Sequence, residues 1–270
     1  MAKQNISMDT LWESHTLVMR FVTPLCGGVP RSDKVLEDWA QLRAETPAAH
    51  SKMVESGCGG PDNKPPRSME EVTKELVETN DTLPEDTDAI MAKSWVGFRK
   101  DETGLFVPGG SVRAHLKDGA GVLGRTFGGG DEESDDRPWG RPVKQFASKL
   151  KNATYIREER VYVRDPQGSI VRGVPLEQAP LGGSGWRDAT QSVMTAQGPR
   201  TCLKRVDMVF PATLTSTILL LRFSEVNLRH IQTILVYLQE HGFGQDRSLG
   251  YGKYVWKLDD VEGPGWSDAK

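Results

Sequence analysis

The sequence predicts an α+β protein, and the last third of the chain carries the clearest evidence for it. Residues 213–223 are apolar and β-branched, which is typical of a buried strand. Residues 227–241 repeat apolar side chains at the spacing of a helix that lies on a sheet. A glycine-rich loop and a second strand, 251–258, follow. Strand, helix, loop and strand in this order form half of a ferredoxin-like fold.

The first half of the chain predicts further elements of the same sheet. Residues 16–22 are rich in apolar and β-branched side chains and run into a turn that contains Pro and Gly, so they predict a strand. Residues 94–107 predict another strand. The segment that follows predicts a helix over 112–123, with Ser111 as its N-cap.

A long polar segment separates these first two strands. Residues 31–91 are interrupted by Gly and Pro, and helical spacing recurs at 33–42 and 69–77, so we predict a helical insertion and not a separate domain. In this interpretation residues 1–257 form a single domain. Residues 258–270 then form an acidic C-terminal tail.

A β-hairpin is predicted at 155–174. Its arms are two strand-like segments, and the Pro and Gly of the 165–168 segment between them suit a β-turn. The arms carry four arginines, several of which alternate onto one face: Arg157, Arg160, Arg164 and Arg172. We expect the hairpin to project from the sheet. The alternative is a solvated edge hairpin whose arginines prevent aggregation. The segment 196–208 then leads into the strand at 213–223.

Length and composition exclude several classes of protein. The hydrophobic share of 37% is low for a compact chain of 270 residues, so we expect a core beneath long polar loops. No apolar run approaches the roughly 20 residues of a membrane span. The first ten residues lack the pattern of a secretory signal, so we expect a cytoplasmic protein with no membrane partner. We also expect no cofactor. We expect no metal site, because the three cysteines lack zinc-site spacing: Cys26, Cys58 and Cys202.

The net charge of −3 hides a strong asymmetry along the chain. Residues 1–136 carry 15 Lys and Arg against 24 Asp and Glu, whereas residues 137–257 carry 18 against 9. A positive half joined to a negative half indicates a surface for a polyanion on one part of the molecule. Ordinary scatter of charge is the alternative.

The most specific segment is GFGQDRSLGYGKY at 242–254. Its glycines allow positive φ and close backbone approach, so that N–H groups can point at a phosphate. Basic side chains supply charge and a tyrosine supplies a stacking face. The order helix, loop, strand excludes a nucleotide-binding P-loop, which lies between a strand and a helix. The candidate phosphate-binding residues are Gly244, Arg247, Ser248, Gly250, Tyr251, Gly252 and Lys253.

This loop resembles the C-terminal glycine-rich loop of the RAMP superfamily, the repeat-associated RNA-binding proteins of CRISPR effector complexes. A second segment, LFVPGGSVRAHL at 105–116, is similar to the family's Pro-Gly-Ser element between a strand and a helix. The resemblance implies a ferredoxin-like, RNA-recognition-type core. The helix N-terminus at Ser111, with Arg113 and Lys117 one turn apart, would offer amide dipoles and two cations to a backbone phosphate.

The resemblance also implies a function. The chain would bind the backbone of a guide RNA (crRNA) in several copies, beside copies of itself and other effector subunits, for recognition of complementary RNA or DNA. The 155–174 hairpin would act as a thumb over the guide. Two alternatives remain: a ribonuclease of the same fold, and a stand-alone phage or mobile-element relative that binds single-stranded nucleic acid. We expect no catalysis. Asp33 is the candidate if the chain cleaves RNA, and His15 is a weaker one.

Overall fold

The computed structural model describes residues 11–30, 95–127, 143–180, 182–195 and 198–268. The chain divides into two compact units. Unit 1 consists of Met1–Val29, Val96–Asp188 and Val206–Lys270, and unit 2 of Pro30–Trp95 and Ala189–Arg205. The predicted insertion 31–91, with its expected helices and Asp33, belongs to unit 2 and lies outside the described residues.

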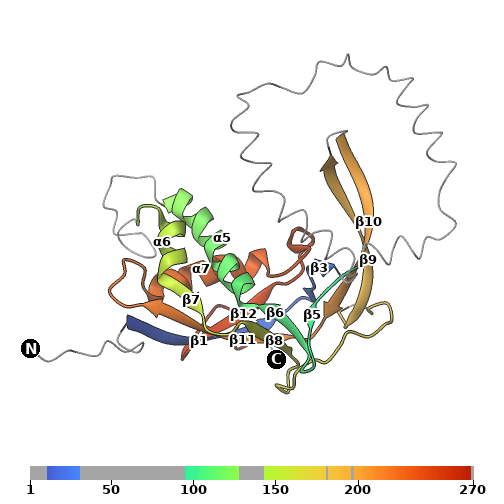
Figure 1. Cartoon of the computed structure of the whole chain (residues 1–270), viewed down its shortest axis with the longest axis horizontal. Helices are drawn as coiled ribbons and strands as arrows, with labels where there is room; N and C mark the ends of the chain where they lie inside the picture. The colour runs from blue at the N-terminus through green and yellow to red at the C-terminus, as the bar shows by residue number, and fades with distance from the viewer. Residues whose placement is uncertain (1–10, 31–94, 128–142, 181, 196–197, 269–270) are drawn as a thin grey trace, which may run out of the picture. The chain divides into compact units, whose positions relative to one another are not determined.

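Unit 1 is an α+β structure built on one antiparallel sheet. Its strand order is β13-β12-β1-β11-β8-β6-β5, and β7 also pairs with β11. The strands are β1 (Trp12–Phe21), β5 (Arg99–Lys100), β6 (Leu105–Pro108), β7 (Thr154–Ile156), β8 (Arg160–Arg164), β11 (Thr213–Leu221), β12 (Tyr254–Leu258) and β13 (Val261–Glu262). Three helices lie on one side of this sheet (Figure 1): α5 (Gly109–Phe127), α6 (Phe146–Ala153) and α7 (Leu228–His241).

The core lies between these helices and the sheet. Alternate residues of β1 are buried on the helix side, whereas the residues between them face away from the core, as the two-residue period of a strand requires. The stripe predicted for the 227–241 helix is confirmed, because Ile231, Leu235 and Leu238 are buried. Asn227 caps this helix in a capping box with His230, which fixes where α7 begins.

Two expected elements near the start of unit 1 differ in their bounds. The predicted strand 94–107 is broken into β4 (Trp95–Gly97), β5 and β6. The break between β5 and β6 occurs because the Asp101 carboxylate accepts hydrogen bonds from the Thr103 and Gly104 amides and so closes a turn. Helix α5 begins at Gly109 and not at 112, so Ser111 is its third residue and the N-cap assignment was wrong.

The 155–174 segment keeps its turn but not its second arm. The Gly168 amide donates to the Asp165 carbonyl at 3.0 Å, which confirms the predicted β-turn. The expected strand at 169–174 is reduced to a single bridge between Arg164 and Ile170. Both strands of the segment, β7 and β8, are paired within the main sheet, where β11 binds both of them.

Residues 259–268, expected as an acidic tail, are folded against the sheet. Strand β13 pairs with β12. A Cβ atom at Gly263 would lie 2.4 Å from the Trp256 ring, so the backbone passes directly over that side chain. The Arg20 guanidinium of β1 lies 4.4 Å from the centre of the Trp266 ring.

The remaining described strands are short or belong to a long hairpin. Strand β2 (Leu25–Cys26) pairs with the end of β10 (Gly198–Val209) at Met208 and Val209, and the expected segment 196–208 lies mainly in β10. Strand β9 (Gly185–Thr195) pairs with β10, and β3 is Val29–Pro30. None of the helices in the described ranges is long and apolar enough to cross a membrane.

Candidate nucleic-acid interface

The glycine-rich loop joins α7 to β12 and is closed at its base by backbone contacts. The Phe243 amide donates to the Gly252 carbonyl at 2.8 Å, and the Gly252 amide donates to the Pro24 carbonyl at 2.9 Å. A Cβ at Gly252, where φ is 70°, would lie 1.9 Å from the Phe243 carbonyl oxygen. A Cβ at Gly242 would lie 2.3 Å from the backbone carbonyl oxygen of Tyr251. These two glycines therefore permit the close approach that shapes the loop.

A buried aromatic cluster anchors the loop beneath its base. Phe243 is buried and its ring meets the His115 ring edge-on at 5.1 Å. His115 Nε2 lies 3.0 Å from the Tyr254 hydroxyl. Burial lowers the pKa of His115 to about 3, with smaller contributions from Arg247 and His241, so this imidazole is neutral at physiological pH. His115 is thus a structural residue that fixes the loop against α5.

The tip of the loop is exposed. Residues Arg247–Leu249 form a single 3-10 turn between Asp246 and Gly250, both of which adopt left-handed backbone angles. Gly250 has open space where a Cβ would lie, in contrast to Gly252. Arg247 and Ser248 are exposed. The tip therefore presents a cation and a hydroxyl to solvent, with backbone that a ligand can approach closely.

The cations of the loop have carboxylate neighbours. Lys253 Nζ lies 2.8 Å from Glu240, and this hydrogen bond lowers the pKa of that carboxyl. Arg247 lies 3.9 Å from Asp118 of α5. Exposed pairs of this kind stabilise a protein by only about 0–1 kcal/mol, so a phosphate can replace the carboxylate at little cost.

Two further cations belong to segments that contact this loop. Lys117 is exposed, and the residue that follows it on α5, Asp118, is the carboxylate neighbour of Arg247. The Arg187 guanidinium of β9 lies 4.9 Å from the centre of the Tyr251 ring. Sequence reasoning missed Arg187, because no local pattern links it to a loop some sixty residues later. We call Lys117, Arg187 and the 244–253 segment the loop site.

The other residues expected on α5 do not belong to the loop site. Arg113 donates a hydrogen bond to the Lys151 carbonyl, and its guanidinium lies 5.5 Å from the Tyr155 ring centre. These contacts tie α5 to the end of α6 and to β7. Ser111 is half-buried in the first turn of the helix.

The four arginines of 155–174 are spread over separate partners. Arg157 donates to the Ser14 hydroxyl at 2.9 Å, and Arg160 pairs with Asp101 at 2.7 Å. Arg164 donates to the Gly168 carbonyl at 2.7 Å, within its own turn, and Arg172 is exposed. Arg160 and Arg164 share one face of β8, but the set does not gather at the loop site.

His15 also has a structural role. Its Nδ1 lies 2.7 Å from Asp259, and the same carboxylate accepts a hydrogen bond from the Thr16 amide at 2.7 Å. The pair thus joins β1 to the turn after β12. In the described part of the chain, no group of three or more His, Cys, Asp or Glu side chains could hold a metal ion.

Comparison with known proteins finds similar solved structures but no matching family model or curated protein. Among solved structures, a chain of a "Type IV-B CRISPR Complex" aligns over 93% of this chain and 93% of its own length, with 9% identity and a TM-score of 0.39.

Proposed function

We propose that this chain is an RNA-binding subunit of a CRISPR effector complex, of the RAMP type, that holds the backbone of a guide RNA. The observation that carries the proposal is the loop site, where the exposed glycine-rich tip between α7 and β12 combines an aromatic ring with several cations. The same loop carries the resemblance in the sequence.

The order of elements supports a ferredoxin-like core. Six elements of unit 1 follow one another along the chain as β1, α5, β7, β11, α7 and β12, with other elements between some of them, and in the sheet their four strands lie in the order β12-β1-β11-β7. Two βαβ halves interleaved in one antiparallel sheet, with both helices on one side, define this fold. RNA-recognition modules commonly use such a sheet and its flanking loops.

The loop site is suited to binding the backbone of an RNA without recognising its base sequence. Arg247, Lys253 and Lys117 offer charge to phosphates, and the Tyr251 ring, already beside Arg187, offers a stacking face to any base. Charge on phosphates and stacking on a ring do not distinguish one base edge from another. We therefore expect little preference for sequence, as a guide-binding subunit requires.

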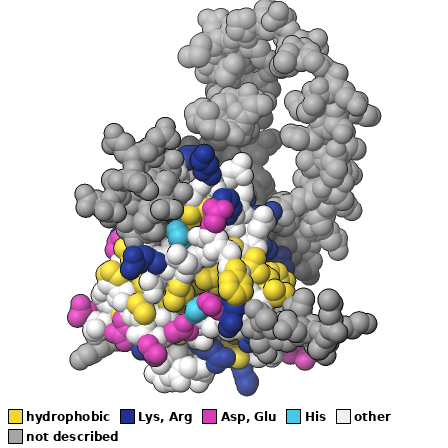
Figure 2. Space-filling view, turned by 90° about the vertical axis from the view of Figure 1, so that its left-hand side faces the viewer, with side chains coloured by type: hydrophobic (Ala, Val, Ile, Leu, Met, Phe, Trp, Pro, Cys, Tyr) yellow, Lys and Arg dark blue, Asp and Glu magenta, His cyan; other side chains and the backbone are white. Residues whose placement is uncertain are grey.

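Assembly in several copies along the guide is part of the proposal. Phe223 supports it, because its side chain is 98% exposed while its φ of 62° is unfavourable for a bulky residue. Figure 2 shows further hydrophobic side chains at the surface among basic and acidic ones. An exposed aromatic side chain in this conformation fits a contact with a neighbouring copy or another effector subunit.

The proposal is tested by binding of fluorescently labelled single-stranded RNA to the full chain. Unrelated sequences should bind within about threefold of one another, and Tyr251→Ala should weaken all of them, by about tenfold. Tyr155→Ala, which removes another partly exposed tyrosine of unit 1, is the matched control. Absence of RNA binding by the wild-type chain, or equal binding by the two variants, would contradict the proposal.

A further inference from the structure

A second candidate site lies on the sheet of unit 1 and shares no lining residue with the loop site. A pocket of about 550 Å³ opens where β1, β11 and β8 meet, on the side of the sheet that faces away from the helices. Arg20, Thr213 and Thr215 form part of its lining, together with Arg164 and the turn that follows it. This volume is within the usual range for sites that bind small molecules, roughly 300–1,000 Å³.

The strand register places two arginines on either side of one threonine. Arg20 of β1 is directly opposite Thr213 of β11, and Thr213 is directly opposite Arg164 of β8. Directly opposed residues of antiparallel strands point to the same face. Because neighbouring strands lie about 5 Å apart, the two arginine backbones are about 10 Å apart. Side chains of this length can converge from both sides on one anion above Thr213.

Both guanidinium groups are held by neighbouring residues. The Arg20 group stacks 4.4 Å from the centre of the Trp266 ring, and Arg164 donates to the Gly168 carbonyl at 2.7 Å. Ordered side chains lose less conformational freedom when a ligand binds. Guanidinium groups also match the oxygens of a phosphate by paired N–H donors, which a lysine does not do.

The rest of the pocket is suited to a ring and a sugar. Phe210, Pro211 and Pro166 are partly or fully exposed apolar side chains in its lining. Two carboxylates, Asp165 and Asp268, line it as well. They balance the two arginines, so a simple anion gains little, whereas a phosphate ester with hydroxyl groups can satisfy both kinds of partner. Carboxylates commonly accept hydrogen bonds from ribose hydroxyls.

We propose that this pocket binds a ribonucleotide, with its phosphate between Arg20 and Arg164 and its ring against Phe210 and Pro211. The nucleotide is either a free mononucleotide or one residue of an RNA chain that also contacts the loop site. The second source rests on the proposed function, and the first does not.

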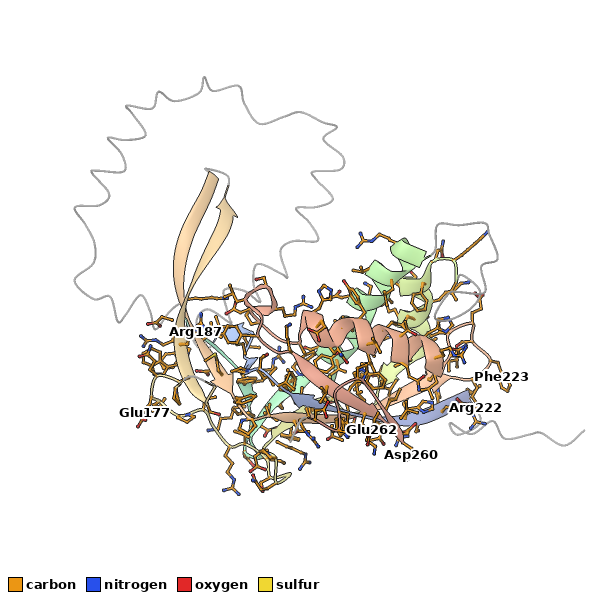
Figure 3. The ribbon with its side chains drawn as sticks, turned by 180° about the vertical axis from the view of Figure 1, so that it is seen from behind. Glu177, Arg187, Arg222, Phe223, Asp260 and Glu262 are labelled. Carbon is orange, nitrogen blue, oxygen red and sulfur yellow. The ribbon has the colours of Figure 1, made fainter. Side chains whose placement is uncertain are left out.

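The test is calorimetric titration of the full chain with uridine 5′-monophosphate, with uridine, and with a single-stranded RNA of about twelve nucleotides. The variants are Arg164→Ala, Arg164→Lys and Arg20→Lys. Arg222→Ala is the control, since Arg222 is an exposed arginine just beyond the other end of β11, with Glu13 as its neighbour (Figure 3). Thermal unfolding of each variant confirms that the chain is folded.

We expect each pocket variant to weaken a phosphate-bearing ligand by about tenfold or more, and the control to leave it unchanged. If the pocket variants bind the mononucleotide more weakly, the ligand of the pocket is a free nucleotide. If they bind only RNA more weakly, the ligand is one nucleotide of an RNA strand. If the folded wild-type chain binds no mononucleotide and the pocket variants bind RNA as tightly as the control, the pocket proposal is overturned. If the mononucleotide binds and RNA does not, the pocket proposal stands and the proposed function fails.

Discussion

Removing the two cations of the glycine-rich loop should change RNA binding far more than stability. Arg247 is 42% and Lys253 is 39% exposed, and each has an exposed carboxylate neighbour. Each exposed pair contributes at most about 1 kcal/mol to folding, so Arg247→Ala with Lys253→Ala should lower the free energy of unfolding by less than about 2 kcal/mol. The same change removes two phosphate contacts. Each contact with a single strand contributes about 0.7 to the slope of log affinity against log salt, so the slope should become shallower by about 1.4.

Fluorescence anisotropy of labelled single-stranded RNA over a range of salt concentrations measures this slope. The matched control is Arg222→Ala with Lys257→Ala, which removes the same charge from two cations that also have carboxylate neighbours, Glu13 and Glu262. The control slope should equal that of the wild type. An unchanged slope in the loop variant, or an equal change in the control, would refute the assignment of the loop to the RNA backbone.

Three further predictions concern the fold around the loop site and the surface. Gly252→Ala should lower the free energy of unfolding by roughly 3 kcal/mol or more, measured by chemical denaturation, because the new Cβ meets the Phe243 carbonyl. Gly250→Ala has the same backbone strain but open space around the Cβ, so it should cost only about 1–2 kcal/mol. Equal costs would contradict the loop geometry. Phe223→Asn should raise the free energy of unfolding by about 0.5–1 kcal/mol, because asparagine tolerates a positive φ. The same variant should reduce the number of copies that bind a long RNA, measured by size-exclusion chromatography. Unaltered assembly would show that Phe223 does not contact a neighbouring copy. The pKa of His115 falls from 6.5 to about 3 on folding, so between these pH values the unfolded chain binds an extra proton and the stability of the fold should decrease as the pH drops. In His115→Gln this pH dependence, measured by thermal unfolding, should be weaker. A profile identical to that of the wild type would contradict the buried, neutral state of His115.

The main elements of unit 1 could be predicted because their patterns are local. The apolar spacing of 227–241 and the β-branched run at 213–223 determine α7 and β11 without knowledge of their partners. Helix α6 was missed, although Phe146, Leu150 and Ala153 have helical spacing, because it is short and charged. The break at Asp101 depends on side-chain hydrogen bonds to the backbone, which an apolar pattern does not reveal.

The candidate sites depended more strongly on tertiary structure. The loop at 242–253 could be identified because glycine, basic and aromatic residues follow one another in sequence. The arginine pair of the pocket comes from strands that are distant in sequence and are brought together by their register, and the loop's neighbour Arg187 meets Tyr251 only in the folded chain. Conversely, Arg113 and Arg160 were expected on phosphates because of their charge, and the fold uses them in internal contacts with Lys151 and Asp101.

The most direct test of the central claim is to map where RNA touches the chain. The full chain is bound to single-stranded RNA that contains 4-thiouridine, irradiated, digested and analysed by mass spectrometry. We predict cross-links in the peptide that contains residues 242–254, with Tyr251 among the modified positions, and in the peptide that contains Lys117. RNA that binds the chain but cross-links only to peptides outside the loop site and the pocket on the sheet would contradict the account.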